Sequence, residues 1–269
     1  MKEKHRIGLV GGGQMAEALI RGMLAAHLFS PEDILIIDPD PGRTEYLTKT
    51  YGVEHAASPQ QLCDLCLTLI LAVKPQVCDA VLRQYTGISS EHLVISIMAG
   101  IPIGVMEKLI NAPCKIIRAM PNTPALVLAG ATAISLNEQC LEDDRKIANN
   151  IFSAIGICVE VPEPQLDAVT GLSGSGPGYI FTIIDGLIDG GVLAGLPRPV
   201  AQQLVLQTVY GSAKLGLESN ENASALKAMV TSPGGTTIHG IQQLEQHGIR
   251  SALMAAVHGA TQRSQELGS

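Results

Sequence analysis

The sequence contains no tryptophan, and aromatic residues make up only 3% of its 269 residues. Charged residues are also scarce, at 16%, whereas an average soluble protein has about 25%. Alanine, leucine, isoleucine and valine supply most of the 46% hydrophobic content, which is too high for an intrinsically disordered chain. The small number of charges leaves an apolar surplus that needs an explanation, because the chain has too little charge to cover itself.

Positive charge is in deficit, since 18 Lys and Arg residues face 25 Asp and Glu residues, for a formal net charge of -7. A surface that binds nucleic acid needs the opposite sign, so we expect no nucleic-acid partner. The longest apolar stretch, residues 65–73, is far shorter than the ~20 residues of a transmembrane helix. Glycines follow the first apolar residues too early for the core of a signal peptide. We therefore expect no membrane partner and no export signal.

The six cysteines form no regular framework, which excludes a small disulfide-rich protein. Cys63 and Cys66 make one CxxC pair, but no second pair and no nearby histidine pair completes a zinc site. We therefore predict no metal ion. We interpret the cysteines as buried thiols in a reducing compartment and expect a cytoplasmic protein.

The length predicts two domains, at ~150 residues per domain. In the first half, short apolar runs alternate with helical stretches. The predicted strands are residues 6–10, 34–37, 67–72, 92–97 and 115–118. Continuous apolar strands separated by helices indicate a parallel sheet covered on both faces. We therefore predict an α/β fold, with a doubly wound Rossmann sheet in residues 1–162.

Residues 163–269 show long helical windows and no convincing strand, which predicts an all-helical second domain. Its predicted helices are residues 179–193, 199–217, 223–230 and 249–267. The window 179–193 is apolar on nearly all faces, and a helix of that kind must be buried on every side. A domain of ~100 residues has difficulty burying such a helix alone, so we expect this domain to form a homodimer. A central helix in a monomeric bundle is the alternative.

The stretch from Gly11 to Ala16 follows the first predicted strand and opens a helix in the pattern GxGxxA. In this pattern Gly11 permits a tight turn, Gly13 lets the backbone approach a pyrophosphate, and Ala16 lets the helix pack on the strand. The N–H groups of the helix N-terminus, from Gln14 on, face the anion. The context of strand, turn and helix makes this a dinucleotide-binding motif.

Asp38 ends the second predicted strand, where an acid takes the 2′-hydroxyl of the adenine ribose in NAD-binding proteins. Arg43, five residues further on, is close enough in sequence to meet the 2′-phosphate of NADP instead. The stretch Asp38 to Gly42 is also typical of a simple turn. The loop therefore leaves the choice between NADH and NADPH open.

Four further loops carry candidate ligand contacts. Two of them follow predicted strands. In doubly wound sheets, ligands bind beyond the carboxyl ends of the parallel strands. These two loops contain Ala72, Val73, Lys74 and Pro75, and Met98, Ala99 and Gly100. The other two, residues 171–178 and 232–238, offer backbone N–H groups and hydroxyls ahead of helices, as anion sites do. As bare loops they would be linkers.

Five segments of the sequence, in this order, resemble the pyrroline-5-carboxylate reductase family over essentially the whole chain. The segments are IGLVGGGQMAEALIRGM, LAVKPQ, RAMPNTPA, VTGLSGSGPGYIF and VTSPGGTTIHGIQQLE. The resemblance implies an N-terminal Rossmann domain and a helical domain that interlocks in a homodimer, with a larger ring of dimers as a further expectation. It also implies reduction of 1-pyrroline-5-carboxylate to L-proline with NADPH, or with NADH.

Position by position, the resemblance implies a cofactor site and a substrate site. The implied cofactor contacts are Gly11, Gly13, Gln14, Met15, Ala16, Asp38, Ala72, Val73, Lys74, Pro75, Met98, Ala99 and Gly100. Arg43 is a further candidate cofactor contact from its place in the loop after the second strand. The implied substrate contacts are Glu163 and the backbone N–H groups of Gly235, Thr236 and Thr237. The hydroxyl of Thr237 would hydrogen-bond the imine nitrogen, which makes Thr237 the candidate catalytic residue.

Two other functions remain as alternatives. A β-hydroxyacid dehydrogenase shares the glycine-rich start and a helical second domain, but it needs a catalytic Lys-Asn pair. Lys214 and Lys227 are followed at the required spacing by Glu218 and Thr231. A protein that senses a dinucleotide without turnover would not need the SPGGTT loop for a carboxylate.

Overall fold

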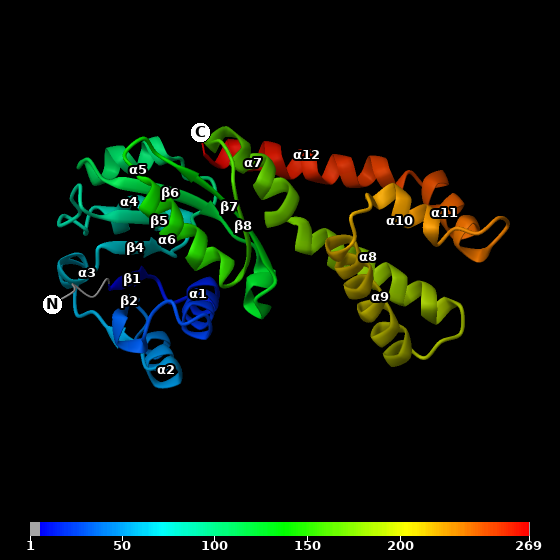
Figure 1. The fold of residues 1–269 in the computed structure, drawn as a ribbon, viewed down its shortest axis with the longest axis horizontal. Coiled ribbons are helices and arrows are strands. Elements are labelled where there is room, and N and C mark those ends of the chain that lie inside the picture. Colours follow the sequence, from blue (N-terminus) through cyan, green and yellow to red (C-terminus); the bar gives the residue numbers. More distant parts are fainter. Residues whose placement is uncertain (1–5, 269) are drawn as a thin grey trace. The chain divides into compact units, whose positions relative to one another are not determined.

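The computed structural model describes residues 6–268 and divides them into two compact units. The first unit comprises the described residues up to Ser175 together with those from Gly259 on, and we call it the sheet unit. The second comprises residues 176–258, and we call it the helical unit. Figure 1 shows the strands gathered in the first unit and helices alone in the second.

Within residues 6–268, eight strands form one sheet in the order β3-β2-β1-β4-β5-β6-β7-β8. The strands are β1 (Ile7–Val10), β2 (Ile34–Ile37), β3 (Glu54–His55), β4 (Thr68–Leu71), β5 (Leu93–Ser96), β6 (Lys115–Met120), β7 (Gly130–Leu136) and β8 (Gly156–Glu160). The first six strands have the 3-2-1-4-5-6 order of the Rossmann fold and are parallel. The predicted α/β fold class is therefore confirmed.

One part of the sheet differs from the expected parallel arrangement. Strand β7 runs antiparallel to β6, with Ile117 opposite Leu136, and β8 pairs parallel to β7. We did not predict β3, β7 or β8. The run GATAISL of β7 is rich in small and polar residues, so its strand conformation depends on pairing with β6 rather than on local sequence.

The helices of the sheet unit begin and end where local chemistry dictates. They are α1 (Gln14–Ala25), α2 (Pro41–Tyr51), α3 (Pro59–Leu65), α4 (Cys78–Leu82), α5 (Ile103–Ile110), α6 (Glu142–Ser153) and α7 (Leu166–Val169). At the start of α3, the hydroxyl of Ser58 accepts the N–H of Gln61 at 3.1 Å, as an N-cap does. Helix α2 ends at Gly52, whose φ of +73° is the left-handed conformation that favours glycine.

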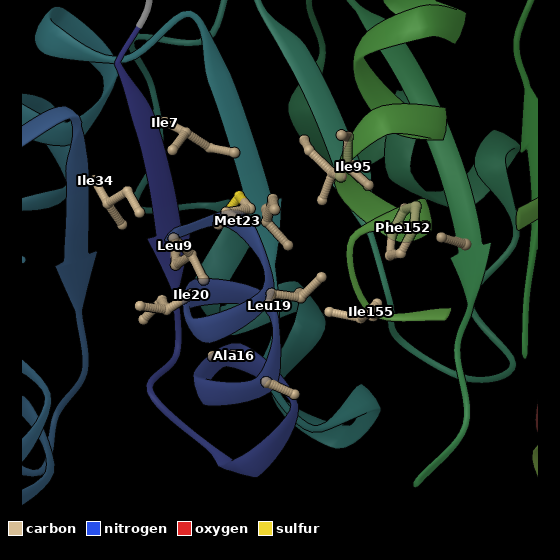
Figure 2. Packing of buried hydrophobic residues seen from close by; sticks show 14 of the residues in the cluster. Ile7, Leu9, Ala16, Leu19, Ile20, Met23, Ile34, Ile95, Phe152 and Ile155 are labelled. Atoms are coloured by element: carbon tan, nitrogen blue, oxygen red, sulfur yellow. The ribbon is translucent and has the colours of Figure 1, made fainter. Parts of the chain in front are cut away.

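Buried hydrophobic residues form a separate layer on each face of the sheet. One layer joins β1, β2 and β5 to α1 and α6, and Figure 2 shows Leu19, Ile20 and Met23 of α1 in this layer beside Leu9 of β1. Phe152 and Ile155 extend the same layer. The other layer joins the opposite faces of the strands to α3, α4 and α5. This two-faced burial is why the strands are continuously apolar.

The helical unit consists of α8 (Gly176–Leu193), α9 (Arg198–Glu218), α10 (Ala223–Met229), α11 (Thr236–Gln246) and the first part of α12 (Ile249–Leu267). Of the hydrophobic side chains in residues 176–258, only Ile184, Ile188 and Ala201 are buried, where α8 packs on α9. We expected a helix after residues 232–238 without giving its bounds, and the structure shows that this helix, α11, already begins at Thr236. None of the helices described by the structure is long and apolar enough to cross a membrane.

The compact units differ from the domains that we expected to meet at residue 163, and that domain boundary stays a prediction. Residues 163–175 lie in the sheet unit, and so does the last part of α12. A hydrogen bond within the sheet unit joins these two segments: the hydroxyl of Ser264 in α12 donates to the carboxylate of Asp167 in α7 at 2.7 Å.

Candidate active site

The turn between β1 and α1 is shaped for close approach of a ligand. Gly11 has a φ of +99°, and a Cβ there would lie 2.6 Å from the carbonyl oxygen of Ala72, so only glycine fits. A Cβ on Gly13, by contrast, would meet no atom within 4 Å, and Gly13 and Gln14 are both exposed. The turn therefore presents open backbone at Gly13 and is tightly packed at Gly11.

The start of α1 supplies hydrogen-bond donors at this turn. The first intrahelical bond runs from the N–H of Glu17 to the carbonyl of Gly13 at 3.0 Å. The N–H groups of Gln14, Met15 and Ala16 lie ahead of that bond, at the positive end of the helix dipole. Ala16 is fully buried against the sheet, which holds the helix close to β1. N–H groups at a helix N-terminus are suited to an anion such as a pyrophosphate.

Asp38 anchors the turn from the end of β2. Its carboxylate accepts the N–H of Gly12 at 2.6 Å through Oδ2 and the N–H of Asp40 at 2.8 Å through Oδ1. Arg43 reaches the same turn from α2, where its Nε donates to the carbonyl of Gly12 and its Nη2 pairs with Glu17. The two side chains that the sequence left as alternatives for the ribose therefore both bind the backbone of Gly12, Asp38 at its N–H and Arg43 at its carbonyl oxygen.

A cavity of about 360 Å³ opens beside Asp38. Its lining includes Gly11 and Val10 at the end of β1, Ile37 and Asp38 at the end of β2, and Val73 after β4. It thus lies beyond the carboxyl ends of strands at the point where the strand order reverses, between β1 and β4. This is where doubly wound folds bind nucleotides, and the mixture of apolar walls with one carboxylate suits an adenosine.

The two loops after β4 and β5 differ in exposure. Ala72 donates its N–H to Val10 at 2.8 Å and packs its carbonyl against Gly11, while Lys74 is exposed and Pro75 begins a short turn. Met98 is buried, and Gly100 has a φ of +74°. A Cβ on Gly100 would lie 3.2 Å from the Cβ of Leu267, so the end of α12 packs on the loop that contains Ala99.

Glu163 belongs to a partly buried polar cluster, centred on Arg118, that the sequence did not reveal. Its Oε1 accepts the N–H of Ile103, at the start of α5, at 2.7 Å and lies 3.2 Å from Nη1 of Arg118. Arg118 is only 6% exposed, and its Nη2 lies 3.8 Å from Asp167. The cluster therefore ties β6, α5 and the segment after β8 together. The one sequence signal for it was an arginine inside an otherwise apolar strand.

The SPGGTT loop precedes α11 in the helical unit. Gly234 has a φ of +67°, and the N–H of Gly235 donates to the carbonyl of Ser232 at 3.1 Å. Thr236 and Thr237 occupy the first two positions of α11, where N–H groups have no intrahelical acceptor, and both side chains are exposed. Of the three amides expected to hold a carboxylate, those of Thr236 and Thr237 are thus at the helix terminus, and that of Gly235 already has an acceptor.

The residues of the sheet unit fit a dinucleotide, as the open backbone at Gly13 and the cavity beside Asp38 show. Within residues 6–268, no group of three or more His, Cys, Asp or Glu side chains is arranged to hold a metal ion. All six cysteines are free thiols. The pKa of Cys66 is raised to about 12 and that of Cys63 to about 11, mainly by burial, so neither thiol is an activated nucleophile.

The fold and the glycine turn define a dinucleotide-binding protein of the Rossmann class. Residues 6–100 match the family model described as NADP oxidoreductase coenzyme F420-dependent, and residues 163–267 match the one described as pyrroline-5-carboxylate reductase dimerisation. The chain is 50% identical to pyrroline-5-carboxylate reductase of Synechocystis sp. over 98% of each chain, and 38% identical to that of Escherichia coli over 98% of each. The chain belongs to the pyrroline-5-carboxylate reductase family.

Solved structures agree with this assignment. A pyrroline-5-carboxylate reductase from Coxiella burnetii superposes with a TM-score of 0.93 at 34% identity, covering 99% of each chain. The Plasmodium falciparum pyrroline carboxylate reductase with NADP bound has a TM-score of 0.89 at 34% identity, also over 99% of each chain. A ketol-acid reductoisomerase from an uncultured archean, at 14% identity and a TM-score of 0.66, shares the fold alone.

Proposed function

We propose that the chain reduces 1-pyrroline-5-carboxylate to L-proline with NADPH, the last step of proline biosynthesis. The observation that carries this proposal is the near-complete match, at up to 50% identity, to relatives that bear the name of this activity. The NADP bound to the Plasmodium falciparum relative supports NADPH as the cofactor. The chain would then be an oxidoreductase that acts on a carbon–nitrogen bond.

In this proposal the turn of the sheet unit binds the dinucleotide. Gly11 and Gly13 let the backbone approach the pyrophosphate, and Gln14, Met15 and Ala16 supply N–H groups from the start of α1. Asp38 and Arg43 stand at the adenosine end, beside the cavity. The loops with Ala72, Val73, Lys74 and Pro75 and with Met98, Ala99 and Gly100 line the ribose and the nicotinamide.

The SPGGTT loop holds the substrate. Its carboxylate is a small anion, and the N–H groups at the start of α11 are suited to bind one. The hydroxyl of Thr237 donates to the imine nitrogen and holds or relays a proton there. Gly235 shapes the loop, since a Cβ at that position would lie 2.2 Å from Oγ of Ser232. A contact of Glu163 with the substrate would use Oε2, because Oε1 accepts from Ile103 and faces Arg118.

The chemistry asks little of side-chain acids. The bound dinucleotide, when reduced, supplies a hydride to the carbon of a C=N bond that is already electrophilic. The protein's own residues then have to orient the substrate, keep its carboxylate bound and supply a proton at nitrogen. The loop has a hydroxyl and backbone donors for this work, and His239 near it is occupied, with Nδ1 2.9 Å from the carbonyl oxygen of Gly235.

The helical unit supports a homodimer. Large hydrophobic side chains on its helices are exposed, among them Phe181 (63%), Leu193 (91%) and Leu217 (82%). The match of residues 163–267 to a dimerisation family supports association through these helices, and we extend the proposal to a larger ring of dimers. The free thiols support a reducing cytoplasm as the site of the reaction.

The test is an assay of the purified chain with 1-pyrroline-5-carboxylate and NADPH. We expect loss of absorbance of the reduced cofactor together with formation of proline in equal amount. Cofactor binding without substrate-dependent oxidation would contradict the proposal and favour a sensing protein. Turnover of a β-hydroxy acid with oxidised cofactor, in the absence of pyrroline-5-carboxylate reduction, would favour the dehydrogenase. The same assay with NADH gives the cofactor preference.

A further inference from the structure

The guanidinium of Arg43 is held in place from three sides. Its Nε donates to the carbonyl of Gly12 and its Nη2 pairs with the carboxylate of Glu17. Its Cζ lies 4.9 Å from the centre of the Tyr46 ring, within the range of a cation–π contact. About a quarter of the Arg43 side chain remains exposed. This cation therefore has a fixed place at the turn and an anionic partner.

Glu17 is itself fixed by tyrosines of α2. Its Oε1 accepts the hydroxyls of Tyr46 at 3.0 Å and Tyr51 at 2.9 Å, while Oε2 faces Arg43. Burial acts to raise the pKa of Glu17, but the hydrogen bonds from Arg43, Tyr51 and Tyr46 outweigh it, and the pKa lies below its usual value. Glu17 is thus a carboxylate at neutral pH.

Arg43 and Asp38 bind the backbone of the same residue, Gly12, at its carbonyl oxygen and its N–H respectively. A Cβ on Gly12 would lie 3.2 Å from Cγ of Arg43 and 3.5 Å from Cβ of Asp38. In Rossmann proteins an acid at this place binds the 2′-hydroxyl of the ribose, and a nearby arginine accommodates a 2′-phosphate. This chain has both groups, so the balance of charge around Gly12 decides how a 2′-phosphate is received.

We propose that Glu17 is a positioning residue that sets the choice between NADPH and NADH, because its ion pair with Arg43 weakens the attraction of that arginine for the 2′-phosphate. The inference rests on the proposed function only in that the chain must bind a nicotinamide dinucleotide. Asp38, Glu17 and Arg43 together carry one negative charge in excess. This net negative charge repels the 2′-phosphate of NADPH. NADH has an uncharged 2′-hydroxyl at that position and is not repelled in this way.

The first variant is Glu17→Gln, which removes the charge and keeps an amide oxygen that accepts from the tyrosines. We expect the Kd of NADPH to fall about three- to tenfold relative to that of NADH, the size of effect that one partly screened charge has near a surface. The ratio of the two dissociation constants is measured by fluorescence titration without substrate. Calorimetry with 2′,5′-ADP and 5′-AMP isolates the contribution of the 2′-phosphate.

The second variant is Arg43→Ala, for which we expect the opposite shift, because two carboxylates then face the phosphate. Glu17→Gln should raise the affinity for NADPH relative to NADH by less when it is combined with Arg43→Ala, because Glu17 acts through Arg43. The matched control is Glu142→Gln, which removes one carboxylate that pairs with an arginine, Arg145, in the exposed first turn of α6. It should leave the NADPH to NADH ratio unchanged.

The outcomes are distinct. A ratio that Glu17→Gln leaves unchanged or shifts toward NADH would overturn the inference, and so would an equal gain with and without Arg43. If Glu17→Gln does not fold, an unchanged ratio in Arg43→Ala overturns it instead. A wild-type chain that binds neither cofactor would overturn the proposed function, and this inference with it. Binding of both cofactors with an insensitive ratio would overturn the inference alone.

Discussion

The two compact units treat their hydrophobic side chains in opposite ways. The sheet unit buries its apolar residues in two layers, and residues such as Phe152, Leu19 and Ile36 have no exposed surface. The helical unit buries only three hydrophobic side chains within residues 176–258 and leaves Phe181 and Tyr210 more than half exposed. The apolar surplus of the composition therefore belongs to the helical unit. The sheet unit has a complete core of its own, whereas the helical unit needs a partner to complete one.

The largest effect should come from the core of the sheet unit. Phe152→Ala removes a fully buried ring from the layer between the sheet, α1 and α6, which typically costs about 3–5 kcal/mol of the free energy of unfolding. Urea denaturation followed by circular dichroism measures the loss. The matched control is Val127→Ala, a residue of the same unit that is 75% exposed and should change stability by less than ~0.5 kcal/mol. Equal losses in the two variants would show that the core is not where we place it.

The corresponding change in the helical unit should affect association instead. Phe181→Glu puts a charge on α8 at a position that is 63% exposed within the chain, so the folded subunit tolerates it, but a dimer interface does not. We expect a shift from dimer to monomer in sedimentation at micromolar concentration. Val127→Glu makes the same change on an exposed apolar residue of the sheet unit and should leave the dimer intact. A dimer that survives Phe181→Glu would place the interface elsewhere.

Local sequence predicted the parts of the fold in which each residue's environment follows from its neighbours along the chain. The strand 34–37 and the helix 249–267 were predicted with the bounds that the structure has, because continuous apolar runs and helical periodicity are local signals. Strand β7 could not be predicted in this way. Its small residues become a strand because Ile117 and Ala119 of β6 lie opposite Leu136 and Ile134. The sequence of one segment alone does not show which strand it will pair with.

In the candidate site, too, the features formed by neighbouring residues could be predicted, and the contacts between residues distant in the sequence could not. The glycine turn could be predicted because Gly11 and Gly13 are only two positions apart in the sequence and each has one conformational role. The ion pair of Glu17 with Arg43 and the cluster of Arg118 with Glu163 join residues 26 and 45 positions apart. Their partners are set by how helices pack on the sheet, so no spacing rule could identify them. The roles of Thr237 and of the SPGGTT loop stay predictions.

Turnover tests whether the SPGGTT loop of the helical unit takes part in the reaction, whereas we propose that the glycine turn of the sheet unit binds the cofactor. Thr237→Ala should lower kcat about 10- to 100-fold, the cost of one hydrogen bond worth about 1.5–3 kcal/mol in the transition state. The Kd of NADPH, measured by titration, should change less than ~twofold, because the cofactor contacts that we propose are all in the sheet unit. Thr237→Ser restores the hydroxyl and should recover most of the activity. Equal losses of turnover and of cofactor affinity would contradict the proposal that Thr237 acts on the substrate.

The smallest expected difference between variants concerns the labelling of the cysteines, all six of which lie in the sheet unit. Burial raises the pKa of Cys66 to about 12 and that of Cys63 to about 11, so at pH 8 both thiols stay protonated. Alkylation needs the thiolate, and we expect native labelling to be roughly a hundredfold or more slower than in urea.

The rate of native cysteine labelling is compared between wild type, Phe152→Ala and Phe181→Glu. Phe152 lies in the layer on the opposite face of the sheet from Cys63 and Cys66. Phe152→Ala lowers the free energy of unfolding of the whole sheet unit, so it should raise the rate at which opening of that unit exposes these thiols to labelling. Phe181→Glu separates subunits without loosening the sheet unit, so the rate should stay within about twofold of wild type. Faster labelling in the monomeric Phe181→Glu variant would mean that the dimer also stabilises the sheet unit. The two units would then share one cooperative unfolding reaction, and the complete core of the sheet unit would not be sufficient for its stability.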